Sequence, residues 1–155
     1  MNTKNNSKRG FTIIEVVLVL AIAGLIFLIV FLAVPALQRS QRDTQRRNDA
    51  GRMLTLLGNY QSNNKGAFPS ATGQDAFITN YVKGELNSPS SGSAYTFSWT
   101  RNANANYATD TDTMQIALGA KCDPGNSRAS TSGAGGRNMA VIVPLEGGGA
   151  YCTDQ

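Results

Sequence analysis

Glu15 has the most unusual setting in this sequence, because it lies at the start of a long apolar segment. From Val16 to Val34, all 19 residues are apolar or glycine. A carboxylate in a membrane-spanning helix costs on the order of 2.5–3.5 kcal/mol at mid-membrane, and less near an interface. Glu15 therefore needs a partner that offsets this cost, and ion pairing is the chemistry that an acid in this position can do.

The two cysteines are the next candidates for chemistry. Cys122 and Cys152 both lie near the C-terminus, outside the apolar segment. On the outer side of a membrane, two such thiols are typical of a single disulfide. Two buried free thiols are the alternative. A zinc site is not expected, because two cysteines without any histidine cannot complete a tetrahedral shell.

Two aspartates are candidate calcium ligands. Asp110 and Asp112, together with Asp123, could begin a shell of oxygen ligands. No EF-hand spacing is present, and Thr109–Thr113 fits a hairpin turn equally well. The sequence contains no histidine and no arrangement of a nucleophile with a base, so we expect no enzymatic activity and no cofactor.

The element that carries Glu15 is predicted to be a membrane helix. At about 1.5 Å of rise per residue, the apolar run approaches the ~30 Å hydrocarbon thickness of a bilayer. Lys4, Lys8 and Arg9 precede it, and the positive-inside rule places such an N-terminus in the cytoplasm. Without these three residues the net charge of +4 falls to 11 basic against 10 acidic side chains. A near-neutral remainder gives little reason to expect nucleic acid as a partner.

Three interpretations of this N-terminal segment compete. A secretory signal has a shorter apolar core and ends in small residues, whereas here Pro35-Ala36-Leu37-Gln38 follows a longer run. A plain membrane anchor fits the length and the charge, but it leaves Glu15 and the Gly10-Phe11-Thr12 junction unexplained. The third interpretation rests on Lys8-Arg9-Gly10, followed by Phe11-Thr12-Ile13-Ile14-Glu15 and an unbroken apolar helix, which resembles the class III signal of type IV prepilins.

The resemblance implies that a membrane-embedded peptidase cuts between Gly10 and Phe11 and that the same enzyme N-methylates Phe11. It also implies that Glu15 is the acid used in filament assembly. Cleavage creates a positive amine at Phe11 in a low-dielectric setting, where an unpaired charge is costly. Glu15 of a neighbouring subunit, or of the same chain one helical turn away, can pair with that amine. In the same family, a proline late in the helix coincides with a stretch that loosens on packing, and Pro35 is a candidate for this role or for a simple kink.

The second half of the helix is predicted to be amphipathic. From Ala36 to about Ser62 the apolar residues recur at spacings of three and four, which gives one stripe: Ala50, Met53/Leu54, Leu57 and Tyr60/Gln61. The opposite surface carries Arg39, Arg42, Arg46, Arg47 and Arg52, interleaved with Asp43 and Asp49. This pattern predicts a solvated, ion-paired face. Gly66 is a plausible left-handed cap beyond the helix end.

The rest of the chain is predicted to form a small head. Gln74–Val82 is typical of a short helix, with Phe77, Ile78, Tyr81 and Val82 available for packing. Strands are expected where Tyr95, Phe97 and Trp99 alternate, where Met114, Ile116 and Leu118 alternate, over the apolar run 140–145 and, as a short edge, over 150–152. The expected fold class is α+β: a long N-terminal helix, transmembrane and then amphipathic, packed against a small antiparallel sheet, as in pilins.

The predicted organisation has four segments: a cleaved leader (1–10), a transmembrane and assembly half of the helix (11–37), its amphipathic half (38–63) and the head (64–155). The turns at Gly66-Ala67-Phe68-Pro69 and at Ser88–Tyr95 are similar to a pattern in pilins and pseudopilins. The family resemblance further implies that a disulfide Cys122–Cys152 bounds a variable surface region. Pseudopilins of one type bind calcium in the head, so the resemblance also makes Asp110 and Asp112 candidate calcium ligands.

The leading hypothesis is a structural subunit of an extracellular type IV pilus, supporting adhesion, motility or DNA uptake. A pseudopilin of a type II secretion or competence system is the alternative, and a membrane-tethered binding module with an uncut leader is a third. The implied partners are copies of the same chain, other pilins, the prepilin peptidase, the assembly machinery and the membrane. The chain would wait in the cytoplasmic membrane with its N-terminus inside, and would become extracellular on assembly.

Overall fold

A computed structural model describes residues 10–125 and 127–155 of the chain. The basic residues of the expected leader lie outside the described residues. The chain divides into two compact units, with the boundary between Gln38 and Arg39.

A single helix, α1, runs from Ile13 to Asn63 and spans 51 residues, close to the length expected from the sequence. Its N-terminal part is the one helix in the described chain that is long and apolar enough to cross a membrane. Pro35 lies inside the helix, which stays α-helical on both sides of it. Because proline lacks an amide hydrogen, the carbonyl one turn earlier, at Phe31, loses its usual helical donor.

The C-terminal end of α1 is capped by Gly66, as predicted. Gly66 adopts a positive φ of 80°, and its amide donates to the carbonyl oxygen of Gln61 at 2.7 Å. This bond satisfies one of the carbonyls that the last helical turn leaves without a partner. A side chain at Gly66 would be strained by the backbone conformation, and it would also meet the Arg137 guanidinium at 3.3 Å.

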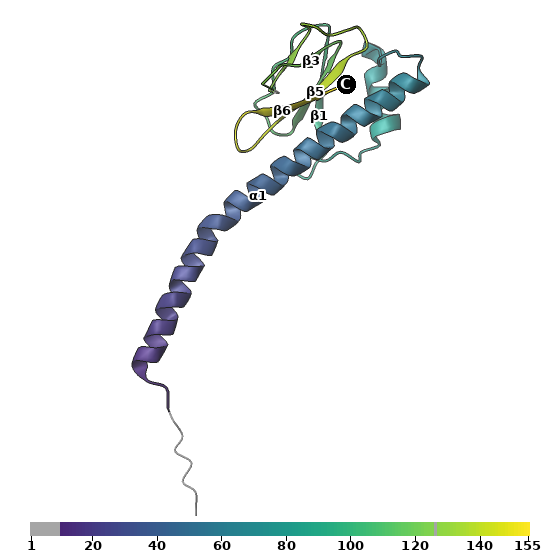
Figure 1. Cartoon of the computed structure of the whole chain (residues 1–155). Helices are drawn as coiled ribbons and strands as arrows, with labels where there is room; N and C mark the ends of the chain where they lie inside the picture. The colour runs from purple at the N-terminus through teal and green to yellow at the C-terminus, as the bar shows by residue number, and fades with distance from the viewer. Residues whose placement is uncertain (1–9, 126) are drawn as a thin grey trace, which may run out of the picture. The chain divides into compact units, whose positions relative to one another are not determined.

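The head is built on a four-stranded sheet in the order β1-β2-β5-β6 (Figure 1). Its strands are β1 (Thr96–Arg101), β2 (Thr113–Leu118), β5 (Met139–Pro144) and β6 (Ala150–Asp154). A second, two-stranded sheet joins β3 (Lys121–Cys122) to β4 (Ala129–Ser130). The predicted short helix over 74–82 is confirmed: α2 (Gln74–Phe77) is α-helical, and η2 (Ile78–Val82) continues it as a π-helical turn. A 3₁₀ turn, η1 (Ala71–Gly73), precedes it. As predicted, the apolar run forms a central strand, β5, which is buried throughout.

The expectation of a purely antiparallel sheet is wrong for one pair of strands. β1 and β2 run parallel, with Thr96 opposite Thr113 and Arg101 opposite Leu118. The connection 102–112 therefore runs back to the end of the sheet at which β1 begins, instead of forming a hairpin. Ala105 anchors it by exchanging backbone hydrogen bonds with Ala129 of β4. Parallel neighbours need a crossover of roughly a dozen residues, and this connection is about that long. The sheet is mixed, and the fold class remains α+β.

The inner face of the sheet packs on the second half of α1. Ala50, Met53 and Leu57 of the predicted stripe are fully buried and lie in one cluster with Met114 and Ile116 of β2. The aromatic side chains of the first alternating segment belong to the same cluster, as do those of the 74–82 segment. Spacings of three and four on α1 and of two on the strands thus gave the correct inward faces.

A smaller cluster covers the opposite face of the sheet. It consists of alanines, Ile142 and Cys152, and Cys122 packs against it. Cys122 of β3 and Cys152 of β6 are paired, with Cα atoms 5.8 Å apart, a separation that a disulfide spans. The two-stranded β3–β4 unit is thereby tied to an edge strand of the main sheet.

Reduction of this disulfide should destabilise the head. The cysteines are 30 residues apart, and in the chain-entropy estimate closing such a loop contributes about 3–4 kcal/mol to the free energy of unfolding. Because the alanine cluster beneath is small, little apolar burial replaces the lost constraint. Urea unfolding of the full chain in detergent, with and without reductant, measures the effect. A Cys122→Ala/Cys152→Ala variant that is insensitive to reductant provides the control, and equal midpoints for wild type in both conditions would contradict the expectation.

Candidate functional site

The first candidate site is the N-terminal end of α1, where the sequence pattern placed Glu15. Its carboxylate oxygen Oε2 accepts a hydrogen bond from the Thr12 amide at 2.9 Å and another from the Thr12 hydroxyl at 2.8 Å. In return, the Glu15 amide lies 3.4 Å from the Thr12 hydroxyl oxygen. This reciprocal arrangement is a capping box, in which residues three apart satisfy the free amides of a helix start.

The capping box adds Thr12 to the site, a residue to which sequence reasoning gave no role. The signal was present, because Thr12-x-x-Glu15 is the spacing of a capping box directly before an apolar run. Only Oε2 is used in this way. The other oxygen, Oε1, accepts no hydrogen bond from the residues that the structure describes. Glu15 can therefore keep its cap and still accept a charged partner.

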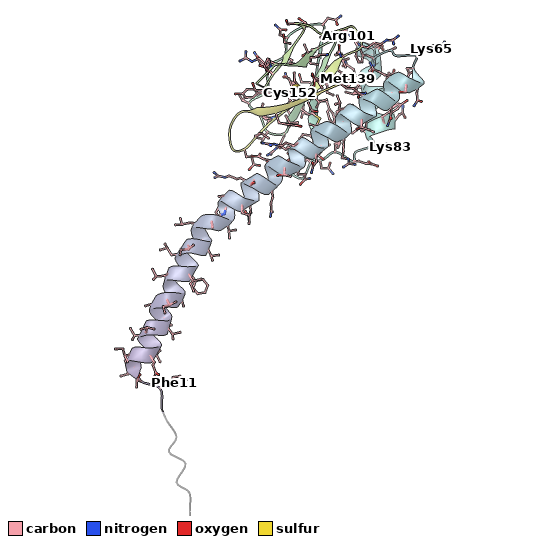
Figure 2. All side chains as sticks on the ribbon, in the orientation of Figure 1. Phe11, Lys65, Lys83, Arg101, Met139 and Cys152 are labelled. Carbon is pink, nitrogen blue, oxygen red and sulfur yellow. A yellow bond between two sulfur atoms is a disulfide. The ribbon has the colours of Figure 1, made fainter. Side chains whose placement is uncertain are left out.

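The surroundings of Glu15 are apolar and open. Figure 2 shows side chains projecting from both sides of the first half of α1, with Phe11 just before the helix begins. Phe11, Ile14 and Leu18 are exposed by 90%, 74% and 58%, and they surround Glu15. A surface of this kind is stable only in lipid or against other helices, because a contiguous apolar surface of this size is unfavourable in water.

In the head, the prediction of a solvated arginine face is wrong for Arg46. This side chain is fully buried. It belongs to a polar cluster that includes Glu146, in the loop after β5. Its guanidinium contacts Asp43 at 3.2 Å, Glu146 at 3.0 Å and the Ser90 hydroxyl. Arg46 lies 4, 7 and 11 residues before Ala50, Met53 and Leu57, so helical periodicity places it on the buried stripe and not opposite it. The 88–93 turn and the β5–β6 loop supply its polar partners. Nothing in the local sequence indicated these two partners.

The β5–β6 loop is held to α1 by further bonds in the same cluster. Arg42 contacts both carboxylate oxygens of Glu146, with its Nη2 at 2.6 Å. Asp43 accepts hydrogen bonds from the backbone amides of Glu146 at 2.8 Å and Gly147 at 3.1 Å. Such charge-assisted, bidentate bonds are the strong class of hydrogen bond in proteins. The cluster Arg42–Asp43–Arg46–Ser90–Glu146 therefore fixes the loop and the turn on the helix.

A pH dependence follows from this cluster. Hydrogen bonds from Arg42 above all, and then from Ser90 and Arg46, lower the pKa of Glu146 to about 2, from an ordinary value of 4.5. Because the folded-state pKa is the lower one, Glu146 contributes stability above pH 4.5 that is lost as the pH falls toward 2. We expect the urea midpoint of the wild type to fall across this window. Glu146→Gln should fall less steeply, and parallel curves for the two proteins would contradict this assignment.

Asp49 also differs from its prediction. It was expected on the solvated face beside Arg46 and Arg52, but it is 5% exposed and accepts a hydrogen bond from the Tyr95 hydroxyl at 3.3 Å. Burial raises the pKa of the Asp49 carboxyl. Arg52, in contrast, remains exposed and pairs with Glu85 at 3.2 Å, as a surface ion pair.

The side chains of the two aspartates that were candidate calcium ligands are engaged in hydrogen bonds within the head, Asp110 in its own turn and Asp112 with Ser88. Asp110 accepts hydrogen bonds from the Asp112 amide and from the Thr113 hydroxyl, both at 3.1 Å. Asp112 accepts one from the Ser88 hydroxyl at 2.5 Å. Within 10–125 and 127–155, no group of three or more histidine, cysteine, aspartate or glutamate side chains gathers as a metal site would require. The local bonds favour the turn, although the turn leads into a parallel strand and not into a hairpin.

Comparison with known proteins bears on the N-terminal site. Residues 5–31 match the family model described as the prokaryotic N-terminal methylation motif. The matched range contains Gly10, Phe11 and the capping box of Thr12 with Glu15. No curated protein and no solved structure matches the chain. The motif is one that structural subunits carry. The chain thus carries the class III signal peptide of type IV prepilins at the start of an α+β, pilin-like fold.

Proposed function

We propose that this chain is a structural subunit of an extracellular type IV pilus, assembled through its N-terminal helix after cleavage between Gly10 and Phe11. One observation carries the proposal: the methylation motif coincides with a carboxylate that is held at the first turn of an otherwise apolar helix. A tether alone would not need this acid, whose presence in a membrane helix is costly. An assembly helix does need it, because an acid can recognise a neighbouring chain.

The partner of Glu15 in this proposal is the amine that cleavage creates at Phe11 of the adjacent subunit. N-methylation keeps the positive charge of an amine, so processing by the peptidase leaves the ion pair possible. In an apolar bundle each charge would be expensive alone, and pairing relieves both. The capping box supports this role, because Thr12 orients the carboxylate through Oε2 and leaves Oε1 available.

Before assembly, the same helix would hold the subunit in the cytoplasmic membrane with its N-terminus inside. The length of the apolar part of α1 and the basic residues ahead of it support this arrangement. On extraction from the membrane, the exposed apolar surface would be covered by the helices of neighbouring subunits. The charged Glu15 and the helical continuity through Pro35 are compatible with both environments.

Intact-mass measurement of the membrane-extracted chain, together with analysis of filaments sheared from cells, tests the proposal. We expect a mature N-terminus at Phe11 carrying one methyl group, and the same species as an abundant component of the filaments. An intact chain beginning at Met1 would contradict processing and would favour a membrane-tethered module. A processed chain that is absent from sheared filaments would contradict the pilus and would favour a pseudopilin.

A further inference from the structure

A cavity of about 400 Å³ opens on the head. It lies between the edge strand β1 and the helical segment 74–82. Six residues line it: Phe97 and Trp99 from β1, Gln74 and Asp75 from α2, and Ile78 and Thr79 from η2. Its volume lies within the range of roughly 300–1,000 Å³ that is typical of small-ligand sites. The proposed filament assembly uses none of these residues.

The strand side of the cavity is aromatic. Phe97 and Trp99 alternate on β1, so both side chains stand on the same face of the sheet. No strand follows β1 at the edge of the sheet, and both rings remain partly exposed. Phe77 packs edge-on against Trp99, with ring centroids 5.9 Å apart. The indole is therefore held in place from behind while part of it stays accessible.

The helical side of the cavity is polar, and its polar groups are not used by the protein itself. The side chains of Gln74 and Asp75 make no hydrogen bond or ion pair with the residues that the structure describes, and the indole N–H of Trp99 donates none to them. The Thr79 hydroxyl donates to the backbone carbonyl of Asp75 at 2.9 Å, which leaves the carboxylate free. Donors and acceptors are thus both available beside an aromatic wall.

The chemistry of the wall decides between ligand classes. No lysine or arginine lines the cavity, so an anion would meet only the carboxylate of Asp75. An alkylammonium group could pair with the carboxylate of Asp75 and with the aromatic faces, but it offers no acceptor to the indole N–H or to the Gln74 amide. Hydroxyl groups both donate and accept. The C–H face of a sugar ring also suits the negative face of an aromatic ring.

We propose that the cavity between β1 and the 74–82 segment is a binding site for a small neutral saccharide. In this site Trp99 stacks on the sugar ring. Asp75 and Gln74 hydrogen-bond its hydroxyl groups. The site is independent of the assembly function, because it lies wholly within the head.

Trp99 makes the test direct, since it is the chain's only tryptophan and its fluorescence reports on this cavity. The full chain in detergent is titrated with a panel of methyl glycosides of the common neutral hexoses and N-acetylhexosamines. We expect a saturable change in Trp99 emission with at least one of them. Asp75→Ala should weaken that binding about tenfold or more, and Gln74→Ala about two- to tenfold, because each removes a hydrogen bond to the ligand and that of Asp75 involves a charge. Asp75 is exposed, so its loss should leave the thermal midpoint unchanged.

Glu85→Gln is the matched control, because Glu85 is an exposed acid of the same head that does not line the cavity. It should bind like the wild type. Failure of every glycoside to change Trp99 emission at millimolar concentration would overturn the proposal. A response to choline chloride with none to the glycosides would also overturn it, in favour of a cationic ligand. Filament formation is read separately, so loss of saccharide binding in a chain that still assembles is distinguishable from failure of the proposed function.

Discussion

Glu15→Val is expected to abolish filament assembly while leaving membrane insertion intact. The substitution removes the only carboxylate from the start of the apolar helix, so the amine at Phe11 of the next subunit would enter the bundle without a counter-charge. An uncompensated charge of this kind costs several kcal/mol, more than enough to stop polymerisation. Insertion should improve slightly, because valine is apolar. The measurement is the amount of the variant in sheared filaments relative to the amount in the membrane fraction.

Two further variants separate the charge of Glu15 from its capping role. Glu15→Gln keeps an oxygen that can accept the hydrogen bonds of Thr12, but it removes the charge. Thr12→Val keeps the charge and removes one hydroxyl contact of 2.8 Å. If ion pairing drives assembly, Glu15→Gln fails like Glu15→Val, and Thr12→Val assembles at a reduced level. Normal filaments from Glu15→Val or Glu15→Gln would refute the proposed role of the charge.

Arg46→Ala is expected to have the largest effect on the stability of the head. The fully buried guanidinium neutralises the partly buried Asp43 and Glu146, so its removal leaves their acidic charge with fewer partners and also leaves a cavity. Breaking a buried ion pair from one side costs about 3–5 kcal/mol. Urea unfolding of the full chain in detergent, followed by Trp99 fluorescence, measures the loss. Arg42 still holds Glu146, and this should keep the effect toward the lower end of that range.

The matched control for Arg46→Ala is Arg52→Ala, on the same helix. Arg52 is 54% exposed in its side chain and pairs with an exposed Glu85, an arrangement that contributes about 0–1 kcal/mol. The two arginines look alike in the sequence but should differ several-fold in their effect on the free energy of unfolding. Equal effects would contradict the burial of Arg46. Arg46→Met adds a second comparison, because an apolar replacement of similar length fills the space without restoring the charge.

Local patterns predicted the helix and its inward stripe with good accuracy. The apolar run, the spacing of Ala50, Met53 and Leu57 and the glycine after the helix end are all properties of neighbouring residues, and each appears in the structure. The same is true of the alternation on the strands. Parallel pairing of β1 with β2 was not predicted, because strand direction depends on where the 102–112 connection is anchored. That anchor, Ala105 on Ala129, joins residues far apart in the sequence.

The sequence by itself determined the features of the N-terminal site, because Gly10, Phe11, Thr12 and Glu15 lie within a few residues of one another. Their chemistry needs only a helix start and an apolar run, both of which are local. The helical period places Arg46 on the buried stripe and Asp49 at its edge, but the tertiary structure alone decided which groups pair with them, and it created the cavity beside Trp99. The partners of these residues, such as Glu146 and Tyr95, come from 46 to 100 positions away. A helical period can indicate which charged residue faces inward, but it cannot state which distant group will pair with it, since that depends on how the whole head closes.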